Sequence, residues 1–275
     1  PSLEEQEELV AAYDKQISLA IDSELEIAVK QHDINNFIFN RLGIKITKNN
    51  SLKRFSIVSF SSLQRWDHAY LQNNAKLKST YPLIGFRDCI ESFMRSADGK
   101  SLRVETYKAP SKEFHYIGME HIEKSTGELI DMPVVKGVQI KSQTVALPKG
   151  YFIYGKLRPY LNKYWYNNTD LDNIVCSSEL FVFKIKDNIN SRYFELVLGS
   201  DIVQRQIADL VSGARMPRIN EEVFMNIRIP IPPIEVQNSI IIHVDKIKSE
   251  MRTLRRSALL NRTIAFTNFE TRIFE

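Results

Sequence analysis

The stretch Pro232-Pro233-Ile234-Glu235-Val236-Gln237 determines how this chain is organised, because it opens a long segment with a regular apolar repeat. Beyond it, apolar residues recur at alternating steps of four and three: Ile240, Val244, Ile247, Met251, Leu254 and Ala258. That spacing is the heptad pattern of a coiled coil. Proline is tolerated before the first turn of a helix but not inside it. The pattern therefore predicts one long helix over residues 231–275.

A similar segment opens the chain. Pro1 and Gln6 correspond to Pro232 and Gln237, and Arg41 lies at the same spacing from Arg272. No Gly or Pro interrupts this segment before Gly43, so we predict a second long helix over residues 1–43. Its apolar stripe is broader than that of the later segment, and it consists of Leu9, Val10, Tyr13, Ile17, Ile21 and Ile27.

We expect the two helices to pair as an antiparallel coiled coil. The residues predicted to bring them together are Tyr13, Ile17 and Ile21 on the first helix and Val244, Ile247, Met251 and Leu254 on the second, with the two groups lying near each other. The alternative is that both are ordinary surface helices on one core. Helices of this length are uncommon in globular domains, where the mean is about 11–12 residues, and this favours pairing.

Residues 44–230 have a different sequence pattern from the two ends of the chain. Runs rich in aromatic and β-branched residues, such as Tyr151–Tyr154, Ile174-Val175 and Leu180–Ile185, predict strands. A helical stretch is predicted over Arg192–Val211, where apolar residues line one face. The fold class expected is a mixed α/β (α+β) domain over 44–230, flanked by the helices at 1–43 and 231–275.

Composition limits the function. The 275 residues are 43% hydrophobic and 25% charged, which is typical of a globular chain, and the net charge of +4 permits nucleic acid as a partner without requiring it. Two cysteines and scattered histidines form neither a disulfide framework nor a metal site. No run approaches the roughly 20 apolar residues of a membrane span. We expect a cytoplasmic protein with no metal or cofactor.

Two loops carry cations beside residues that fix the backbone. The first, Gly155–Lys163, holds Lys156, Arg158 and Lys163 with Tyr160 among them, and the second, Ser212–Arg218, holds Arg215 and Arg218. Lysine and arginine bind phosphates, and arginine also reads guanine through two parallel hydrogen bonds. We predict these six residues as a DNA-binding set. The alternative from the residues alone is a group of solvated loop charges, some paired with carboxylates.

Taken in order, several segments resemble the specificity (S) subunit of type I restriction-modification systems. The matching segments are Tyr116–Gly118, Lys156–Lys163, Cys176–Leu180, Pro217-Arg218 and Pro232–Gln237. In that family they belong to a target recognition domain and the long conserved helix that follows it. Each motif is weak alone, but the ordered set is specific and extends over nearly the whole chain.

The resemblance implies a DNA-recognition subunit that reads one half of a bipartite target in double-stranded DNA. Methyltransferase subunits, and a restriction subunit, would supply the chemistry. The chain itself is expected to be non-catalytic, acting in the prokaryotic cytoplasm. In agreement, the sequence has no Asn-Pro-Pro-Tyr or Asp-Pro-Pro-Tyr motif, no Gly-rich cofactor loop and no phosphate-binding loop.

The chain departs from the family pattern in one respect. A full S subunit alternates two recognition domains with two helical regions, whereas this chain has one recognition domain between two helical regions. A fragment and a natural half-subunit both fit, as do a monomer with self-paired helices, which we favour, and a homodimer. Two other functions also fit: a coiled-coil assembly adaptor that does not read DNA, and the specificity domain of a fused type IIG or IIB restriction enzyme.

Overall fold

The computed structural model describes residues 2–47, 76–208 and 216–274. The chain divides into two compact units, one formed by residues 1–41 with 238–275 and the other by residues 42–237. The first unit is built from the two ends of the chain. The second contains the sheets and the short helices.

Local interactions define both ends of the first long helix, α1 (Leu3–Leu42). The Glu5 N–H donates to Ser2 Oγ (3.3 Å) and the Ser2 N–H donates to Glu5 Oε2 (2.6 Å), which is a capping box. The bond donated by the Ser2 N–H lowers the pKa of the Glu5 carboxyl. At the other end Gly43 has φ +59°, a left-handed conformation that suits glycine after the last helical residue. The predicted stop at Gly43 is confirmed.

The last helix, α7 (Ile234–Phe274), begins directly after Pro232-Pro233. A glutamine suits position 237, four residues after Pro233, because its side chain is buried and both its amide nitrogen and its amide oxygen form hydrogen bonds. Its Nε2 donates to the Pro232 carbonyl (2.9 Å), and its Oε1 accepts from the Asn190 N–H (3.2 Å). The side chain therefore links the start of α7 to the backbone at Asn190.

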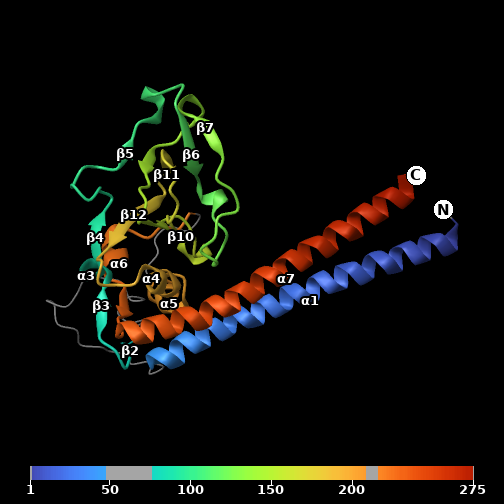
Figure 1. Ribbon diagram of the computed structural model, residues 1–275, viewed down its shortest axis with the longest axis horizontal. Helices are drawn as coiled ribbons and strands as arrows, with labels where there is room; N and C mark the ends of the chain where they lie inside the picture. Colours follow the sequence, from blue (N-terminus) through green and yellow to red (C-terminus); the bar gives the residue numbers. More distant parts are fainter. Residues whose placement is uncertain (1, 48–75, 209–215, 275) are drawn as a thin grey trace, which may run out of the picture. The chain divides into compact units, whose positions relative to one another are not determined.

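The two long helices run antiparallel within their unit, as predicted (Figure 1). Near one end of the pair the Tyr13 ring contacts the Phe269 ring, with centroids 5.3 Å apart. Near the other end Phe37 stacks on His243, with centroids 3.8 Å apart. The early part of α1 therefore lies beside the late part of α7, and the late part of α1 lies beside the early part of α7.

This antiparallel pairing corrects the predicted neighbours. Val244 and Met251 are buried and Ile247 and Leu254 are half-buried, but they lie opposite the second half of α1, since Lys30 there contacts Glu250 at 2.8 Å. They do not lie near Tyr13. The expectation followed the sequence repeat, which aligns the starts of both helices, whereas antiparallel packing aligns the start of one with the end of the other.

Ile21 is a second correction, because its side chain is 45% exposed. The stripe on α1 that is buried passes through Ala20 instead, while Tyr13 and Ile17 are half-buried. The fully buried apolar residues of the pair are Leu9, Ala20, Ile34 and Ile38 on α1, and Ile240, Val244, Met251, Ala258 and Ala265 on α7.

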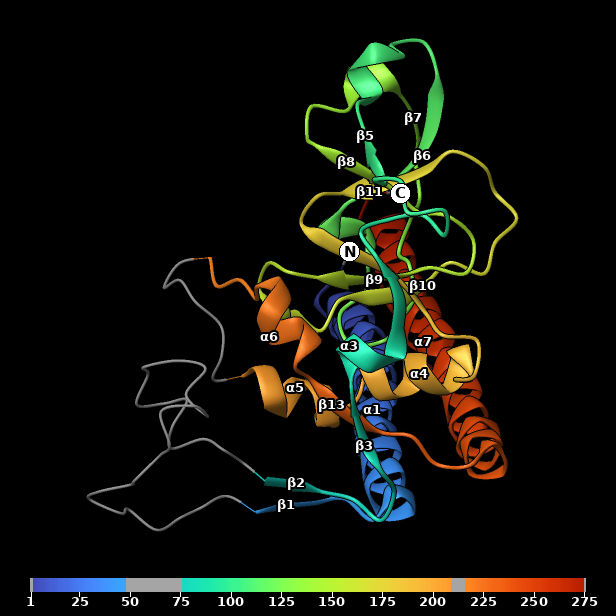
Figure 2. The same ribbon diagram turned by 90° about the vertical axis from the view of Figure 1, so that its left-hand side faces the viewer.

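Two larger sheets form the second unit (Figure 2). One has the order β10-β9-β12-β4 and is antiparallel throughout. Its strands are Tyr164–Tyr166, Phe152–Gly155, Leu180–Ile185 and Ile90–Phe93. The other has the order β5-β8-β11-β6-β7, in which only the β11–β6 pair is parallel. Its strands are Arg103–Val104, Thr144–Ala146, Ile174–Ser177, Glu113–Ile117 and Val134–Lys136.

Two strand pairs complete the described strands. They are β1 (Lys45–Thr47) with β2 (Lys76–Lys78), and β3 (Leu83–Gly85) with β13 (Arg228–Pro230). The short helices are α3 (Phe86–Cys89), α4 (Ser191–Leu198), α5 (Asp201–Ile207) and α6 (Glu221–Met225). The mixed α/β class is confirmed.

Aromatic side chains fill the core between the four-stranded sheet and these helices. Phe152 and Phe183 on neighbouring strands are fully buried, and each contacts the ring of Phe194 on α4. Phe224 on α6 contacts Phe183 as well. Edge-to-face arrangements of this kind suit the charge distribution of aromatic rings. The core therefore fixes the strands that carry the cationic loops.

The single helix predicted over Arg192–Val211 is wrong. The helix is interrupted at Gly199-Ser200, which lie between α4 and α5. Ser200 begins the second helix by accepting the Ile202 N–H on its Oγ (3.3 Å), which is a strong start signal inside an otherwise periodic run. The predicted residues from 209 onward lie outside the described residues.

Candidate nucleic-acid interface

The two cationic loops that are separate in sequence meet in the structure. Leu157 forms a β-bridge with Arg218, the Arg158 N–H donates to the Pro217 carbonyl (2.7 Å), and the Ile219 N–H donates to the Lys156 carbonyl (3.0 Å). Residues 156–158 and 217–219 thus lie as short paired segments. The predicted residues Lys156, Arg158 and Arg218 come together on one backbone frame, whereas Arg215 lies outside the described residues.

Arg158 occupies a strained backbone position. Its φ of 48° and ψ of 58° are left-handed, and Asn162, four residues later, repeats that conformation around the short helix η5 (Pro159–Leu161). Side chains other than glycine rarely adopt this geometry unless their surroundings enforce it. Asn162 is buried and its Nδ2 donates to the Gly199 carbonyl (2.7 Å), which holds the turn. Arg158 is exposed, and Tyr160 is 57% exposed.

Lys156 behaves differently from a surface lysine. Its ammonium lies over the Phe181 ring, 5.0 Å from the centroid, and the side chain is half-buried. Burial lowers the pKa of Lys156, and the Glu179 carboxylate opposes that shift. A cation held over an aromatic face is fixed in place. Lys156 therefore supplies a positive charge at a defined position beside Arg158.

Arg218 is already engaged by an acid. Its Nε and Nη2 donate to the two carboxylate oxygens of Glu179, each at 3.1 Å. This parallel pair is the strong geometry for an arginine and a carboxylate, and it raises the pKa of Arg218. The sequence allowed for carboxylate partners of these cations but did not identify Glu179 as the partner of Arg218. The available signal was the acid in Cys176–Leu180, a segment already singled out.

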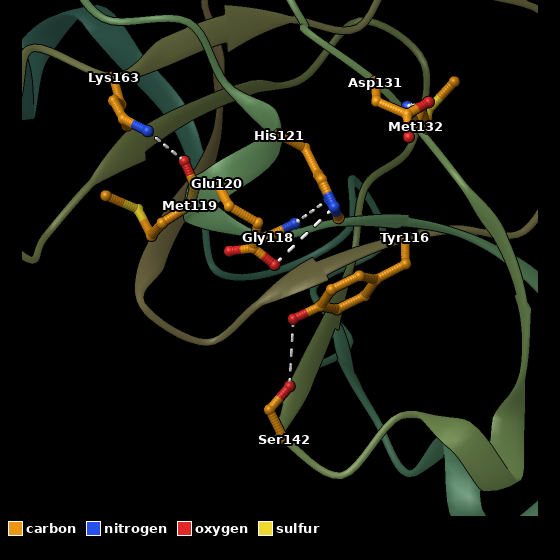
Figure 3. A network of polar contacts seen from close by, with 9 residues as sticks. All are labelled: Tyr116, Gly118, Met119, Glu120, His121, Asp131, Met132, Ser142 and Lys163. Atoms are coloured by element: carbon orange, nitrogen blue, oxygen red, sulfur yellow. Dashed lines mark hydrogen bonds and ion pairs between the residues drawn. The ribbon is translucent and has the colours of Figure 1, made fainter.

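Lys163 also has an internal partner. Its Nζ donates to the Met119 carbonyl (2.5 Å) in the short helix η3 (Met119–His121), as Figure 3 shows. In the same region the Gly118 N–H donates to His121 Nδ1 (3.0 Å). These bonds connect the Tyr116–Gly118 and Lys156–Lys163 segments, so Lys163 holds the fold together. Of the predicted set, Arg158 and Tyr160 are the exposed members without such a contact among the described residues.

No cluster of three metal-binding side chains occurs in residues 2–47, 76–208 and 216–274. Over the same residues, no helix combines the length and apolar character required to cross a bilayer.

Comparison with known proteins gives a consistent family. The family described as the type I restriction modification DNA specificity domain matches residues 89–262. The type I restriction enzyme EcoDI specificity subunit of Escherichia coli is 25% identical over 157 residues, which cover 56% of this chain and 33% of that protein.

Two solved structures share the fold. The HsdS subunit from Thermoanaerobacter tengcongensis aligns with a TM-score of 0.54 and 22% identity, over 64% of this chain and 44% of that one. A chain from a study of complex assembly and conformational transition of the type I R-M system aligns with a TM-score of 0.53 and 23% identity, over the same shares. The chain spans a third of its curated relative and less than half of each solved chain.

Proposed function

The chain belongs to the family of type I restriction modification DNA specificity domains, and we propose that it recognises one half of a bipartite site in double-stranded DNA. In this proposal it is a non-catalytic specificity subunit or half-subunit. The methyltransferase and restriction subunits of a type I system carry out the chemistry on the DNA that it selects.

The observation that carries the proposal is the cationic cluster at the paired segments 156–158 and 217–219. Arg158 is exposed on an enforced left-handed turn, and Lys156 is held over Phe181 beside it. Phosphate contacts by such cations set the position of a protein on a duplex, and arginine with amide side chains reads base edges. Rigid placement matters because a cation on a long flexible side chain attracts phosphates without fixing the position of the protein along the duplex.

The long helices have a second role in the proposal. Their antiparallel pairing gives the unit a fixed length. For a bipartite target, such a length determines the spacing between the two half-sites. Exposed apolar residues on α1, including Leu19, Leu25 and Val29, leave a surface for another subunit. We propose that the methyltransferase subunit binds there.

A selection from a library of random duplexes tests the DNA-reading part. The whole chain is immobilised, and bound duplexes are sequenced at several salt concentrations. Enrichment of a short motif is the expected result. If no motif is enriched at any salt concentration, the chain does not read DNA, and the assembly-adaptor alternative gains support.

The subunit role requires a separate experiment. The chain is expressed with a type I methyltransferase subunit in a host that lacks adenine methylation, and methylated adenines are mapped. A motif that is methylated only when the chain is present is the expected result. Methylation that does not depend on the chain contradicts the role.

A further inference from the structure

A groove of about 490 Å³ lies at the β5 edge of the five-stranded sheet, and none of its lining residues belongs to the cationic cluster. We call it the β5 groove, and define it by Arg103, Glu105, Tyr107, Lys141, Ser142 and Gln143. Small-molecule pockets are mostly apolar and enclose their ligand. The six side chains that define this groove are exposed, and Val104, Val138 and Ile140 add apolar surface beside them, so the groove is an open surface of mixed character that fits the edge of a larger partner rather than an enclosed small molecule.

Two side chains in the β5 groove have the chemistry of base recognition. The Arg103 Nη2 donates to Gln143 Oε1 (3.3 Å), so the guanidinium and the amide lie side by side. Arginine pairs with guanine through O6 and N7, and glutamine pairs with adenine through N6 and N7. Glu105 is occupied by its neighbours, since it accepts from the Tyr107 hydroxyl (2.9 Å) and pairs with Lys108. These contacts balance the negative charge of Glu105, the one carboxylate among the residues that define the groove.

The backbone beneath these side chains is firmly held. Arg103 pairs with Val145 across the β5–β8 ladder, and the buried Thr144 donates its hydroxyl to the Val104 carbonyl (2.7 Å). The Gln143 carbonyl accepts from the Ser178 N–H (3.0 Å). Arg103 lies on β5 and Gln143 directly precedes β8, and side chains on or next to paired strands hold their geometry better than those on free loops, as direct readout requires.

The far wall of the β5 groove is equally close-packed. It is formed where η2 (Thr106–Lys108) meets η4 (Gly137–Gln139). A Cβ on Gly137 would lie 2.4 Å from the Thr106 carbonyl oxygen, so only glycine permits this approach. The Gly137 N–H donates to the Lys112 carbonyl (2.9 Å). Tyr107, which is 63% exposed, is therefore presented from a fixed wall.

We infer that the β5 groove binds the edge of a base pair in duplex DNA, with Arg103 and Gln143 determining which base pair is accepted. This inference rests on the proposed function and assigns it a specificity surface. Lys141, exposed and without a carboxylate partner among the described residues, adds a phosphate contact beside the groove. The cationic cluster at Arg158 then positions the duplex, and the β5 groove discriminates among sequences.

The test uses the whole chain and the random-duplex selection. The variants are Arg103→Lys, which keeps the charge but loses the two-pronged geometry, and Gln143→Ala. The control is Lys149→Ala, which removes an exposed cation paired with Asp170 outside the groove. We expect each groove variant to lose about 10- to 100-fold discrimination at one position of the motif, with binding to random duplex kept within about twofold. The control is expected to enrich the wild-type motif.

The outcomes separate this inference from the proposed function. If the wild-type chain enriches a motif and both groove variants enrich the same motif equally strongly, the inference is wrong and the proposed function stands. Uniform weakening on all sequences with the motif unchanged also overturns it, because the groove then contacts phosphates only. If the wild-type chain enriches nothing, the proposed function fails, and this inference fails with it.

Discussion

Among single residues, the cations differ in whether their side chains face solvent or already have a partner within the protein. Arg158 is exposed on a left-handed turn, whereas Lys163 donates to a carbonyl and Arg218 is held by Glu179. A charge that already has a well-oriented partner costs more to redirect toward DNA than one that faces solvent. The two loops therefore contain both a cation that faces solvent and cations that hold the loops together.

We expect Arg158→Ala to weaken duplex binding by about 1–3 kcal/mol if Arg158 reads a base. Lys156→Ala should instead weaken binding to all sequences and reduce the salt dependence by about one unit of slope, since it neutralises a phosphate. Gel-shift titrations at several salt concentrations measure both, with Lys149→Ala as the control. Unchanged affinity and slope in both variants would remove this cluster from the interface.

Glu179→Gln tests the role of the acid. The amide keeps the shape of the side chain but removes a negative charge beside Arg218 and Lys156, so duplex affinity is expected to rise by about fivefold or less. The loss of folding stability should stay below about 1 kcal/mol, because both partners are partly exposed. Asp170→Asn makes the same change of charge elsewhere and should leave affinity unchanged. Weaker binding by Glu179→Gln would show that Glu179 orients Arg218 for DNA.

At the scale of elements, the pairing of α1 with α7 depends on a narrow buried stripe. Val244 and Met251 are buried in it, whereas Ile242, two residues from Val244, is 73% exposed. Cross-helix contacts between polar residues are exposed, as in the Lys30–Glu250 pair, and contribute little to stability. The apolar stripe therefore provides most of the stability of the pair.

Val244→Asp should break the pairing. A carboxylate in that apolar contact would have no partner and should destabilise the pair by at least about 2 kcal/mol. Circular dichroism and thermal melting measure the loss, and a pull-down with the methyltransferase subunit reports assembly. Ile242→Asp is the matched control and should melt like the wild type. Equal melting of both variants would mean that the pair does not hold the unit together.

At the scale of the whole molecule, both ends of the chain build the same unit. Tyr13 and Phe266 lie in contact near the termini, with ring centroids 6.1 Å apart. A chain that pairs its own two helices benefits from the high effective concentration that its middle residues impose. The buried apolar stripe that a second copy would need for the same antiparallel pairing is already covered by the chain's own second helix.

The isolated chain is therefore expected to be a monomer in dilute solution. Exposed apolar residues such as Leu25 and Val29 would support association only at higher concentration. Light scattering over a concentration series measures the mass. A stable dimer that persists at nanomolar concentration would show that the helices pair between chains instead of within one.

Elements whose signals are local can be predicted from the sequence alone. The heptad spacing and Gly43 predicted the long helices, and the run Leu180–Ile185 predicted β12, because periodicity, caps and strand composition act within a few turns or residues. The ordered motifs also indicated the family. The break at Gly199-Ser200 was as local as these signals, but the apolar period of the surrounding residues concealed it.

Which distant groups meet is seen only in the folded chain. It set the antiparallel register that places Tyr13 beside Phe269, joined Arg218 to Glu179, and brought Arg103 beside Gln143. Periodicity specifies which face of an element is buried but not what lies against that face. The partner is selected by closure of long loops and by packing of the complete core, and neither leaves a signal in a short stretch of sequence.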